Sequence, residues 1–325
     1  MTTFIGSQWA PTRNAVTTFG LCLQRSDLHI PSELFEIAVS FGINLGVSVE
    51  DHGGHDGAIM CLTVFNGKVW SGSKDGTLRS WDNNGKCERK FLGHEGWVLC
   101  LTVYQDAVWS GSSDGSIMVW TDGGCIRQCV GTNNWVTALT TCQNHLWSGS
   151  RDGSLRQWSP KGECIKVCFG HTDWVRCLAA TETGLWSGSY DHRIRLWDTE
   201  GMCTKEITDQ QAMVQTLAVV QNKVWSSSKE GAMRIWDTAG ECAKKIIPND
   251  EQWIRCLAVF QDQVWSGSDD GSIRVWDTNG EHMRNCGSHE EMVTAMVTVG
   301  DYVWSADYQG GMAMWDRDGK CVKMF

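Results

Sequence analysis

Serine, histidine and cysteine are the residue types in this chain of 325 residues that could perform chemistry. Serines recur in Ser-Gly-Ser strings, and a histidine such as His55, His94 or His171 could activate one of them as a nucleophile. The 15 cysteines could bind zinc or form disulfides. Which of these possibilities holds depends on the elements that position the side chains.

Two tryptophans eleven residues apart mark a unit that occurs seven times, with 38 to 40 residues between copies. Self-similarity at such a period is typical of one supersecondary unit stacked on copies of itself. The first tryptophan of the unit is Trp70, Trp109, Trp147, Trp186, Trp225, Trp265 or Trp304. The second is Trp81, Trp120, Trp158, Trp197, Trp236, Trp276 or Trp315.

Each unit has the pattern of four short strands. Asp-Gly, a pair that favours a tight hairpin, stands between the second and third strands at Asp75, Asp114, Asp152 and Asp270. The strands are apolar on both faces, and stacking them blade on blade in a ring covers both faces. The sequence therefore predicts an all-β fold over residues 53–325, a seven-bladed β-propeller with four antiparallel strands per blade. The predicted blades are residues 53–92, 93–130, 131–169, 170–208, 209–248, 249–287 and 288–325.

The same units resemble the WD-repeat family over residues 53–325. Trp-Asp ends the third strand in five units, and Gly-His precedes the first strand in three. The resemblance implies a buried, hydrogen-bonded tetrad of His, Ser, Asp and Trp within a blade. Three tetrads are complete in the sequence: His55, Ser71, Asp75 and Trp81; His94, Ser110, Asp114 and Trp120; and His171, Ser187, Asp191 and Trp197.

The other four units depart from the tetrad pattern. Thr132 stands at the histidine position of the third unit, Gln210 and Glu230 replace His and Asp in the fifth, Asp250 replaces His in the sixth, and Gln309 replaces Asp in the seventh. The resemblance therefore leaves the tetrad open in these blades, although it implies the same fold for them.

The repeat accounts for the residues that first suggested chemistry. The histidine near each serine belongs to the implied tetrad, and Asp75 and Asp114 form turns, so we expect neither a nucleophile nor an acid–base pair. Most cysteines occupy equivalent positions of different blades, too far apart for a disulfide. Cys125 and Cys129 are four residues apart, unlike the close pairs of zinc modules. We therefore predict no catalytic residue, no metal site and no cofactor, and a chain that is not an enzyme.

The net charge of −10 argues against non-specific binding of nucleic acid, which requires a positive surface. The sequence shows neither the pattern of a secretory signal nor a stretch long enough to span a bilayer. We therefore expect no nucleic-acid or membrane partner, and a cytoplasmic or alternatively nuclear location.

Residues 1–52 do not fit the repeat and are predicted to form an N-terminal extension, with a short helix from Pro31 to about Gly42. We expect this segment to pack on the propeller or to lend it a closing strand, and the alternative is disorder. The stretch LHIPSELFEIAVSF also has a faint likeness to the opening of an F-box. That likeness gives an alternative function, a substrate-recognition adaptor of a ubiquitin ligase.

Either end of the chain could supply the strand that closes the ring. CVKMF, residues 321–325, aligns with CERKF, residues 87–91, so the last unit has its own fourth strand. Residues 46–50 could compete for the same place. We favour the strand from the C-terminus.

Two columns of variable residues predict a binding face. Just before the innermost strand the units have Ala58, Trp97, Trp135, Trp174, Met213, Trp253 and Met292. Two residues further on they have Met60, Leu99, Thr137, Arg176, Gln215, Arg255 and Thr294. Side chains at both positions should surround one mouth of the central channel. In WD-repeat proteins, which this chain resembles, these positions commonly contact partners.

The tryptophans could alternatively cap the core beneath the loops. Residue type in their column varies between Ala, Trp and Met, however, whereas the core columns keep nearly the same residue type in every unit, so the column favours a surface over a fixed packing role. Trp and Arg are favoured at interface hot spots and Met suits adaptable contacts. Because Arg176 and Arg255 flank tryptophans, an acidic or phosphorylated segment would fit. We therefore predict a non-enzymatic scaffold for protein or peptide partners. The predicted contact residues are Trp97, Trp135, Trp174, Arg176, Met213, Trp253, Arg255 and Met292.

Overall fold

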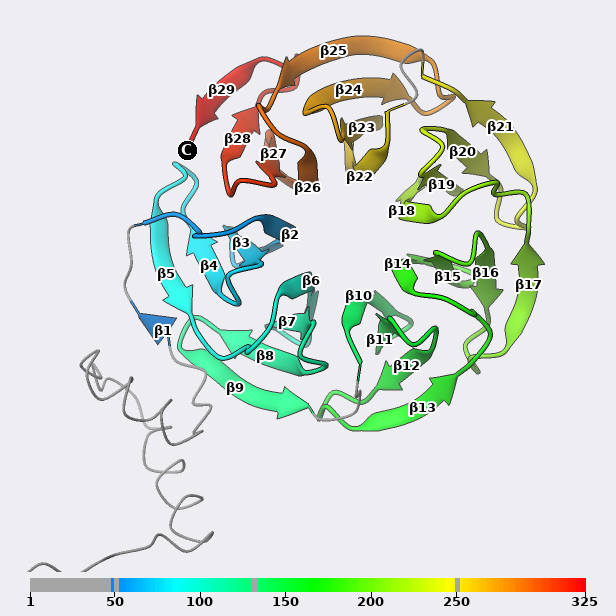
Figure 1. The fold of residues 1–325 in the computed structure, drawn as a ribbon, viewed down its shortest axis with the longest axis horizontal. Coiled ribbons are helices and arrows are strands. Elements are labelled where there is room, and N and C mark those ends of the chain that lie inside the picture. Colours follow the sequence, from blue (N-terminus) through cyan, green and yellow to red (C-terminus); the bar gives the residue numbers. More distant parts are fainter. Residues whose placement is uncertain (1–47, 50–52, 130–133, 249–251) are drawn as a thin grey trace, which may run out of the picture.

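The structure, a computed structural model, describes residues 48–49, 53–129, 134–248 and 252–325. Seven antiparallel sheets stand around a central channel, each with its first strand innermost and its fourth strand on the perimeter (Figure 1). The predicted all-β, seven-bladed propeller is confirmed. No helix occurs within the described ranges, and so none there is long and apolar enough to cross a membrane.

Strands of equal rank in the blades have nearly equal lengths. The first strands are β2 (Ile59–Phe65), β6 (Val98–Tyr104), β10 (Val136–Cys142), β14 (Val175–Thr181), β18 (Val214–Val220), β22 (Ile254–Phe260) and β26 (Val293–Val299). The second strands are β3 (Lys68–Ser73), β7 (Ala107–Ser112), β11 (His145–Ser150), β15 (Gly184–Ser189), β19 (Lys223–Ser228), β23 (Gln263–Ser268) and β27 (Tyr302–Asp307).

The outer two strands complete each blade. The third strands are β4 (Leu78–Trp81), β8 (Ile117–Thr121), β12 (Leu155–Trp158), β16 (Ile194–Trp197), β20 (Met233–Trp236), β24 (Ser272–Asp277) and β28 (Met312–Trp315). The fourth strands are β5 (Cys87–Phe91), β9 (Gly124–Cys129), β13 (Cys164–Cys168), β17 (Cys203–Ile207), β21 (Cys242–Ile246), β25 (His282–Ser288) and β29 (Cys321–Met324). Blade one contains β2–β5, and the numbering continues in fours to blade seven, β26–β29.

The core lies between neighbouring sheets, where both tryptophan columns are at most 5% exposed. The glycine of the Ser-Gly-Ser string permits this close packing. A Cβ at Gly72 would lie 2.5 Å from Cγ1 of Val98 in the next blade. A Cβ at Gly111 would likewise lie 2.5 Å from Cγ1 of Val136. Contacts this short are not tolerated by real side chains, so the string serves to bring one blade against the next.

The C-terminal strand completes blade seven, as we favoured from the sequence. β29 pairs with β28, and the backbone N–H of Phe325 donates to Met312 O at 2.9 Å. The Phe325 ring lies 5.1 Å from that of Trp304 and also against Gly85 of blade one. Lys323 Nζ donates to Asn84 O, again in blade one, at 2.7 Å. The last residues of the chain therefore bind the seventh blade to the first.

The strand β1 (Ser48–Val49) lies on the outer edge of blade one. It pairs antiparallel with β5, Ser48 opposite Phe91 and Val49 opposite Lys90, and makes that sheet five-stranded. The alternative in which this part of the chain closes blade seven is therefore wrong for Ser48 and Val49. The predicted helix and the F-box-like stretch lie outside the described residues.

Candidate functional site

Blade four contains a complete hydrogen-bonded tetrad. Trp197 Nε1 donates to Ser187 Oγ at 2.8 Å, and His171 Nε2 lies 2.7 Å from the same oxygen. His171 Nδ1 lies 2.7 Å from Asp191 Oδ2. Because the indole can only donate, the serine hydroxyl is free to donate to Nε2, which leaves the Nδ1 proton of a neutral imidazole for the carboxylate. The tetrad thus links the third strand, the second strand and the loop before the first.

Blades one and two have the same arrangement. In blade one, His55 Nε2 lies 2.7 Å from Ser71 Oγ and Nδ1 lies 2.8 Å from Asp75 Oδ2. In blade two, His94 Nε2 lies 2.6 Å from Ser110 Oγ and His94 Nδ1 lies 3.2 Å from Asp114 Oδ2. In both blades the second tryptophan donates to the serine, Trp81 at 2.8 Å and Trp120 at 2.7 Å.

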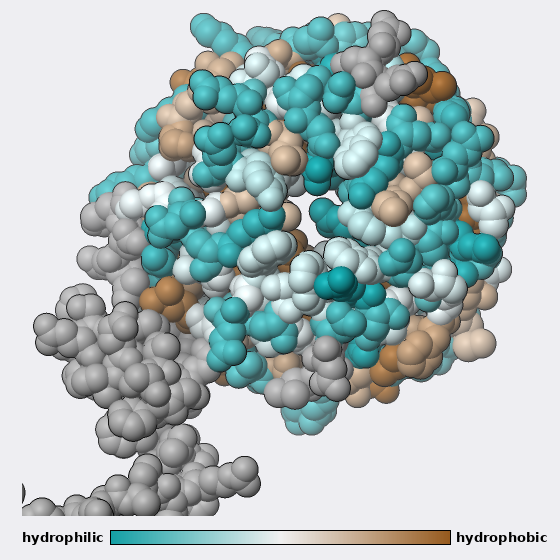
Figure 2. Space-filling view, viewed as in Figure 1, coloured by the Kyte–Doolittle hydropathy of each residue, from teal (hydrophilic) through white to brown (hydrophobic). Residues whose placement is uncertain are grey.

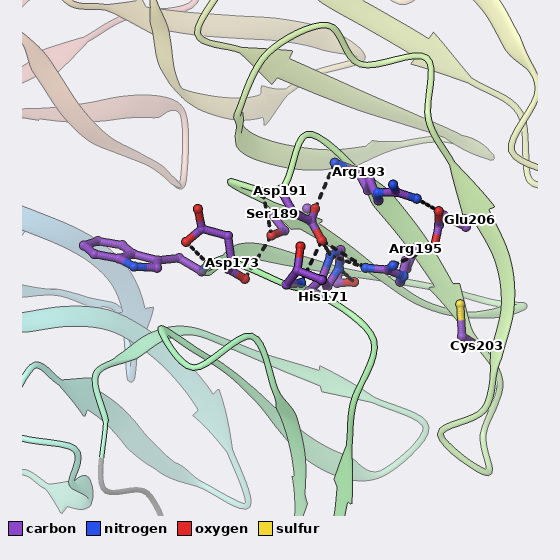
Figure 3. Close-up of polar contacts among 12 residues, drawn as sticks. His171, Asp173, Ser189, Asp191, Arg193, Arg195, Cys203 and Glu206 are labelled. Carbon is purple, nitrogen blue, oxygen red and sulfur yellow. Dashed lines mark hydrogen bonds and ion pairs between the residues drawn. The ribbon is translucent and has the colours of Figure 1, made fainter.

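An arginine extends the network of blade four to the perimeter, as Figure 3 shows. Arg195 Nη1 donates to Asp191 Oδ2 at 3.0 Å, and Nη2 donates to Glu206 Oε2 on the outer strand β17 at 2.6 Å. Toward the channel, the backbone N–H of Asp191 donates to Ser189 Oγ, which donates to Asp173 O. Polar contacts therefore run across the whole blade, and Arg195 has a structural role.

The charge state of the tetrad follows from burial and hydrogen bonding. Burial alone would raise the pKa of Asp191, but the hydrogen bond and charge of His171, with backbone N–H donors, hold it well below its usual range. Burial lowers the pKa of His171, against the opposing effect of Asp191. Ser187 is fully buried, so no substrate reaches its hydroxyl. The tetrad holds the blade together and offers no nucleophile.

Blade seven forms a tetrad that the sequence left open. His289 Nε2 lies 2.6 Å from Ser305 Oγ and Nδ1 lies 2.9 Å from Asp307 Oδ2, while Trp315 donates to Ser305 at 2.7 Å. The acid comes from the end of the second strand, two residues before Gln309. The signal in the sequence was Ser-Ala-Asp in place of Ser-Gly-Ser.

This assignment can be tested in blade seven. We expect Asp307→Ala to lower the free energy of unfolding by about 1–3 kcal/mol, because it leaves the buried His289 without its acceptor. Gln309→Ala removes only an exposed contact with Glu291 and should be nearly neutral. Urea denaturation at neutral pH measures both variants, and equal losses would contradict the assignment.

Blade five replaces the tetrad with a different buried network. Gln210 Nε2 donates to Ser226 Oγ at 2.8 Å, and Arg234 donates to Gln210 Oε1 at 2.8 Å and contacts Glu230 Oε1 at 2.6 Å. In blades three and six the tryptophan–serine bond is present, but Thr132 and Asp250 lie outside the described residues.

The cysteines of the described part of the chain form no disulfide. The 14 cysteines of the described residues are free. Burial raises the pKa of Cys100, Cys177 and Cys256 to about 12, so these thiols stay neutral. Within the described ranges, no group of three His, Cys, Asp or Glu residues could hold a metal ion.

The predicted contact column lies at the channel mouth, on the side of the loops that enter the first strands. Trp97 is 40% exposed and Trp253 is 38% exposed. Trp135, Trp174, Met213 and Met292 are partly buried. Ala58 is buried.

A second column, missed in the sequence, lies beside the first. It is the residue that follows each second strand, and its backbone N–H donates to the carbonyl of the contact-column residue at 2.9–3.1 Å in all seven blades. Its members are Lys74, Ser113, Arg151, Tyr190, Lys229, Asp269 and Tyr308. The two columns therefore form one surface.

Three cations along this surface each lie between two aromatic rings. Lys74 Nζ lies 4.2 Å from the Tyr308 ring and 4.3 Å from the Trp97 ring. The guanidinium of Arg151 lies 4.5 Å from Trp135 and 4.3 Å from Trp174.

The same pattern continues through blades four to six. Trp174 stacks on Tyr190 at 5.5 Å, and Lys229 Nζ lies 4.6 Å from Tyr190 and 5.0 Å from Trp253. Trp135 contacts both Trp97 and Trp174 with centroids within 5.6 Å. We call the whole set the aromatic–cation arc: Tyr308, Lys74, Trp97, Trp135, Arg151, Trp174, Tyr190, Lys229 and Trp253.

The two arginines predicted to flank the tryptophans differ in their partners. Arg255 Nη2 donates to Asp269 Oδ2 at 3.2 Å, and its Nε also contacts this carboxylate, so the charge of Arg255 is largely neutralised. Burial raises the pKa of Cys61, Cys100, Cys177 and Cys256, on the innermost strands of four blades, and the charge of Arg176 on the innermost strand β14 opposes this rise. Among the described residues Arg176 forms no ion pair within 4.0 Å.

Figure 2 looks onto the ring with the channel open at its centre, and residues of intermediate hydropathy, drawn white, border part of the opening beside teal and brown ones. This face carries indoles and phenols for apolar contact and cations for anionic groups. Aromatic and cationic side chains, the types favoured at interface hot spots, therefore lie together on this face.

Comparison with known proteins gives matches along much of the chain. A model described as the IP5P C-F beta-propeller matches residues 45–158, and the model of the WD domain, G-beta repeat, matches residues 162–198 and 240–277. A similar solved structure is that of the computationally designed Ika8 protein, with a TM-score of 0.65 and 27% sequence identity, covering 83% of this chain and 100% of that one. No curated protein matches the chain.

Proposed function

Because the chain is a seven-bladed WD-repeat β-propeller, we propose that it is a scaffold that binds protein or peptide partners on its channel-mouth face. Propellers of this kind are generally protein-interaction scaffolds and are typically non-enzymatic. The observation that carries the proposal is the aromatic–cation arc, which gathers four tryptophans, two tyrosines and three cations on one side of the ring.

The partner that best fits this face has an acidic or phosphorylated segment. Lys74, Arg151 and Lys229 contact aromatic rings and form no ion pair within the described residues, so each can still bind an anion. Arg176 adds a fourth cation at the channel. Charge-assisted hydrogen bonds to phosphate or carboxylate are the stronger class of polar contact, and the surrounding rings supply apolar area.

The proposal is tested with synthetic peptides in matched neutral, acidic and phosphoserine forms. We expect the full chain to bind the acidic and phosphorylated forms more tightly, with affinity that falls as salt rises. Arg151→Ala with Arg176→Ala should weaken this binding by about tenfold to a hundredfold, since a hydrogen bond to a charged group contributes about 1.5–3 kcal/mol. Fluorescence polarisation measures the affinities.

A matched control removes two charges elsewhere. Lys205→Ala with Lys244→Ala changes the net charge equally, but these side chains lie on the outer strands, paired with Glu241 and Glu281. We expect this control to bind as the unmodified chain does. Equal affinity for neutral and phosphorylated peptides would refute the acidic-partner proposal. An equal loss of peptide affinity in the two double variants would refute it as well.

The alternative of a ubiquitin-ligase adaptor rests on the F-box-like stretch, and no comparison supports it. A cytoplasmic or nuclear location is part of the proposal for the scaffold. It agrees with 14 free cysteines among the described residues, because disulfides are rare in reducing compartments.

A further inference from the structure

The outer strand of blade three carries an apolar surface on the perimeter of the ring. Ile165 is 53% exposed, Val167 is 40% exposed, and Phe169, one residue beyond β13, is 78% exposed. Alternate residues of a strand lie on one face, so these three side chains form a continuous stripe. Figure 2 shows brown, hydrophobic residues on the perimeter where Figure 1 places β13.

Five of the other six blades have a polar residue at the centre of the equivalent stripe, whereas blade seven has Met324 there. Val167 stands opposite Arg156 in the β12–β13 register, and five other fourth strands have a polar or charged residue at this position. Charged residues on edge strands disfavour pairing with other chains, although within this chain β1 pairs beside Lys90. Blade three lacks this protection, as does blade seven. The polar residues are Lys90, Gln128, Glu206, Lys245 and Asn285.

The fold itself shows that such an outer edge accepts another strand. In blade one, β1 pairs antiparallel with Lys90 and Phe91, which correspond to Val167 and Cys168 of blade three. The equivalent edge of β13 therefore has suitable geometry, and among the described residues no strand covers it.

We propose that two copies of this chain form a symmetric dimer in which their β13 strands pair antiparallel. Pairing centred on Val167 places Val167 opposite its own copy and Ile165 opposite Phe169, so that every pair on the exposed face is apolar. Lys166 then faces Cys168, and its ammonium already contacts Glu200 O in blade four.

Other registers are less favourable. Centring the pair on Lys166 would place two lysines directly opposite each other, which destabilises antiparallel strands. A shift by one residue would also move the apolar stripe out of register with its copy. The sequence of β13 thus specifies both the partner, a second copy, and the register.

The mass of the full chain in solution tests the dimer. Sedimentation equilibrium over a range of concentrations should give a mass that rises from one chain to two. Val167→Lys introduces the residue type that blades one and five have at this position and should give a single-chain mass, with the melting temperature unchanged. Met324→Lys is the matched control, because Met324 is the equivalent, 56% exposed residue of blade seven, and this variant should still dimerise.

A cross-link tests the register. Across the two-fold axis the Cα atoms of Val167 should lie about 4.5–5.5 Å apart, within the range of a disulfide. Val167→Cys should therefore form a covalent dimer on mild oxidation, whereas Met324→Cys and the unmodified chain should not. A single-chain mass at every concentration, a dimer that survives Val167→Lys, or one abolished by Met324→Lys would each overturn the proposal.

Discussion

Replacing Asp191 with alanine is expected to lower the free energy of unfolding by about 3–5 kcal/mol, the range for breaking a buried charged pair. The side chain of Asp191 is only 3% exposed and contacts both His171 and Arg195. Its loss removes an acceptor from His171 and leaves the buried Arg195 with Glu206 as its remaining acidic partner. Urea denaturation followed by tryptophan fluorescence measures the change.

The equivalent residue of blade three provides a matched control. Asp152 also stands in the turn between second and third strands, but its side chain is 30% exposed and its arginine contact, to Arg156, is 3.2 Å. Asp152→Ala should therefore lower the free energy of unfolding much less, by about 1 kcal/mol or below. A loss as large as that of Asp191→Ala would mean that the turn, and not the tetrad, is the source of stability.

The pH dependence gives a second readout for Asp191. Its pKa in the folded chain is held below the ordinary value, so it contributes stability that is present above about pH 4 and is lost as the pH falls through the folded pKa. The difference between the unmodified chain and Asp191→Ala should thus be constant near neutral pH and shrink below pH 4. If the difference in free energy of unfolding between the two chains stayed the same down to strongly acidic pH, the carboxylate of Asp191 would not be ionised in the folded chain.

Deleting residues 321–325 should lower the melting temperature by about 10 °C, since a loss of about 5 kcal/mol in a domain of this size corresponds to a shift of this order. The deletion removes β29, its hydrogen bonds to β28, and the Phe325 ring that contacts Trp304. It also exposes the edge of β28, so aggregation on heating should increase. Differential scanning calorimetry and light scattering measure the two effects.

A single substitution distinguishes the stability contributed by strand β29 from that contributed by the Phe325 ring. Phe325→Ala keeps β29 but loses the contact with blade one at Gly85, and we expect an intermediate melting temperature. Lys323→Ala, which removes an exposed contact with Asn84 O, should have a much smaller effect. An unchanged melting temperature after the deletion would mean that β29 does not stabilise the closed ring.

The fold was predictable because each unit repeats the same local signals. Fourteen tryptophans in two columns, tight-turn glycines and strands apolar on both faces all indicate one stacked arrangement. The tetrads of blades one, two and four were expected only because the resemblance to the WD-repeat family implied them, residue by residue. The acid of blade seven was missed because Asp307 reaches His289 from a different backbone position, and only the geometry shows that the carboxylate arrives at the same place.

The arrangement of the proposed binding face could be predicted only in part. The contact column was visible because its residues precede the innermost strands, but Lys74, Tyr190 and Lys229 follow the second strands and were not singled out in the sequence. Their cation–π partners belong to neighbouring blades, so they depend on how the sheets are spaced around the ring. The pairing of Arg255 with Asp269 was likewise not evident, because fourteen residues separate them in the sequence.

The cations of the aromatic–cation arc have a consequence for the thermodynamics of association. Lysine and arginine side chains normally lose considerable rotamer entropy when a ligand immobilises them. Lys74, Arg151 and Lys229 are each held between rings of two different residues before any ligand arrives. Part of that entropy is therefore already lost on folding, and association at this face should carry a correspondingly smaller entropic penalty.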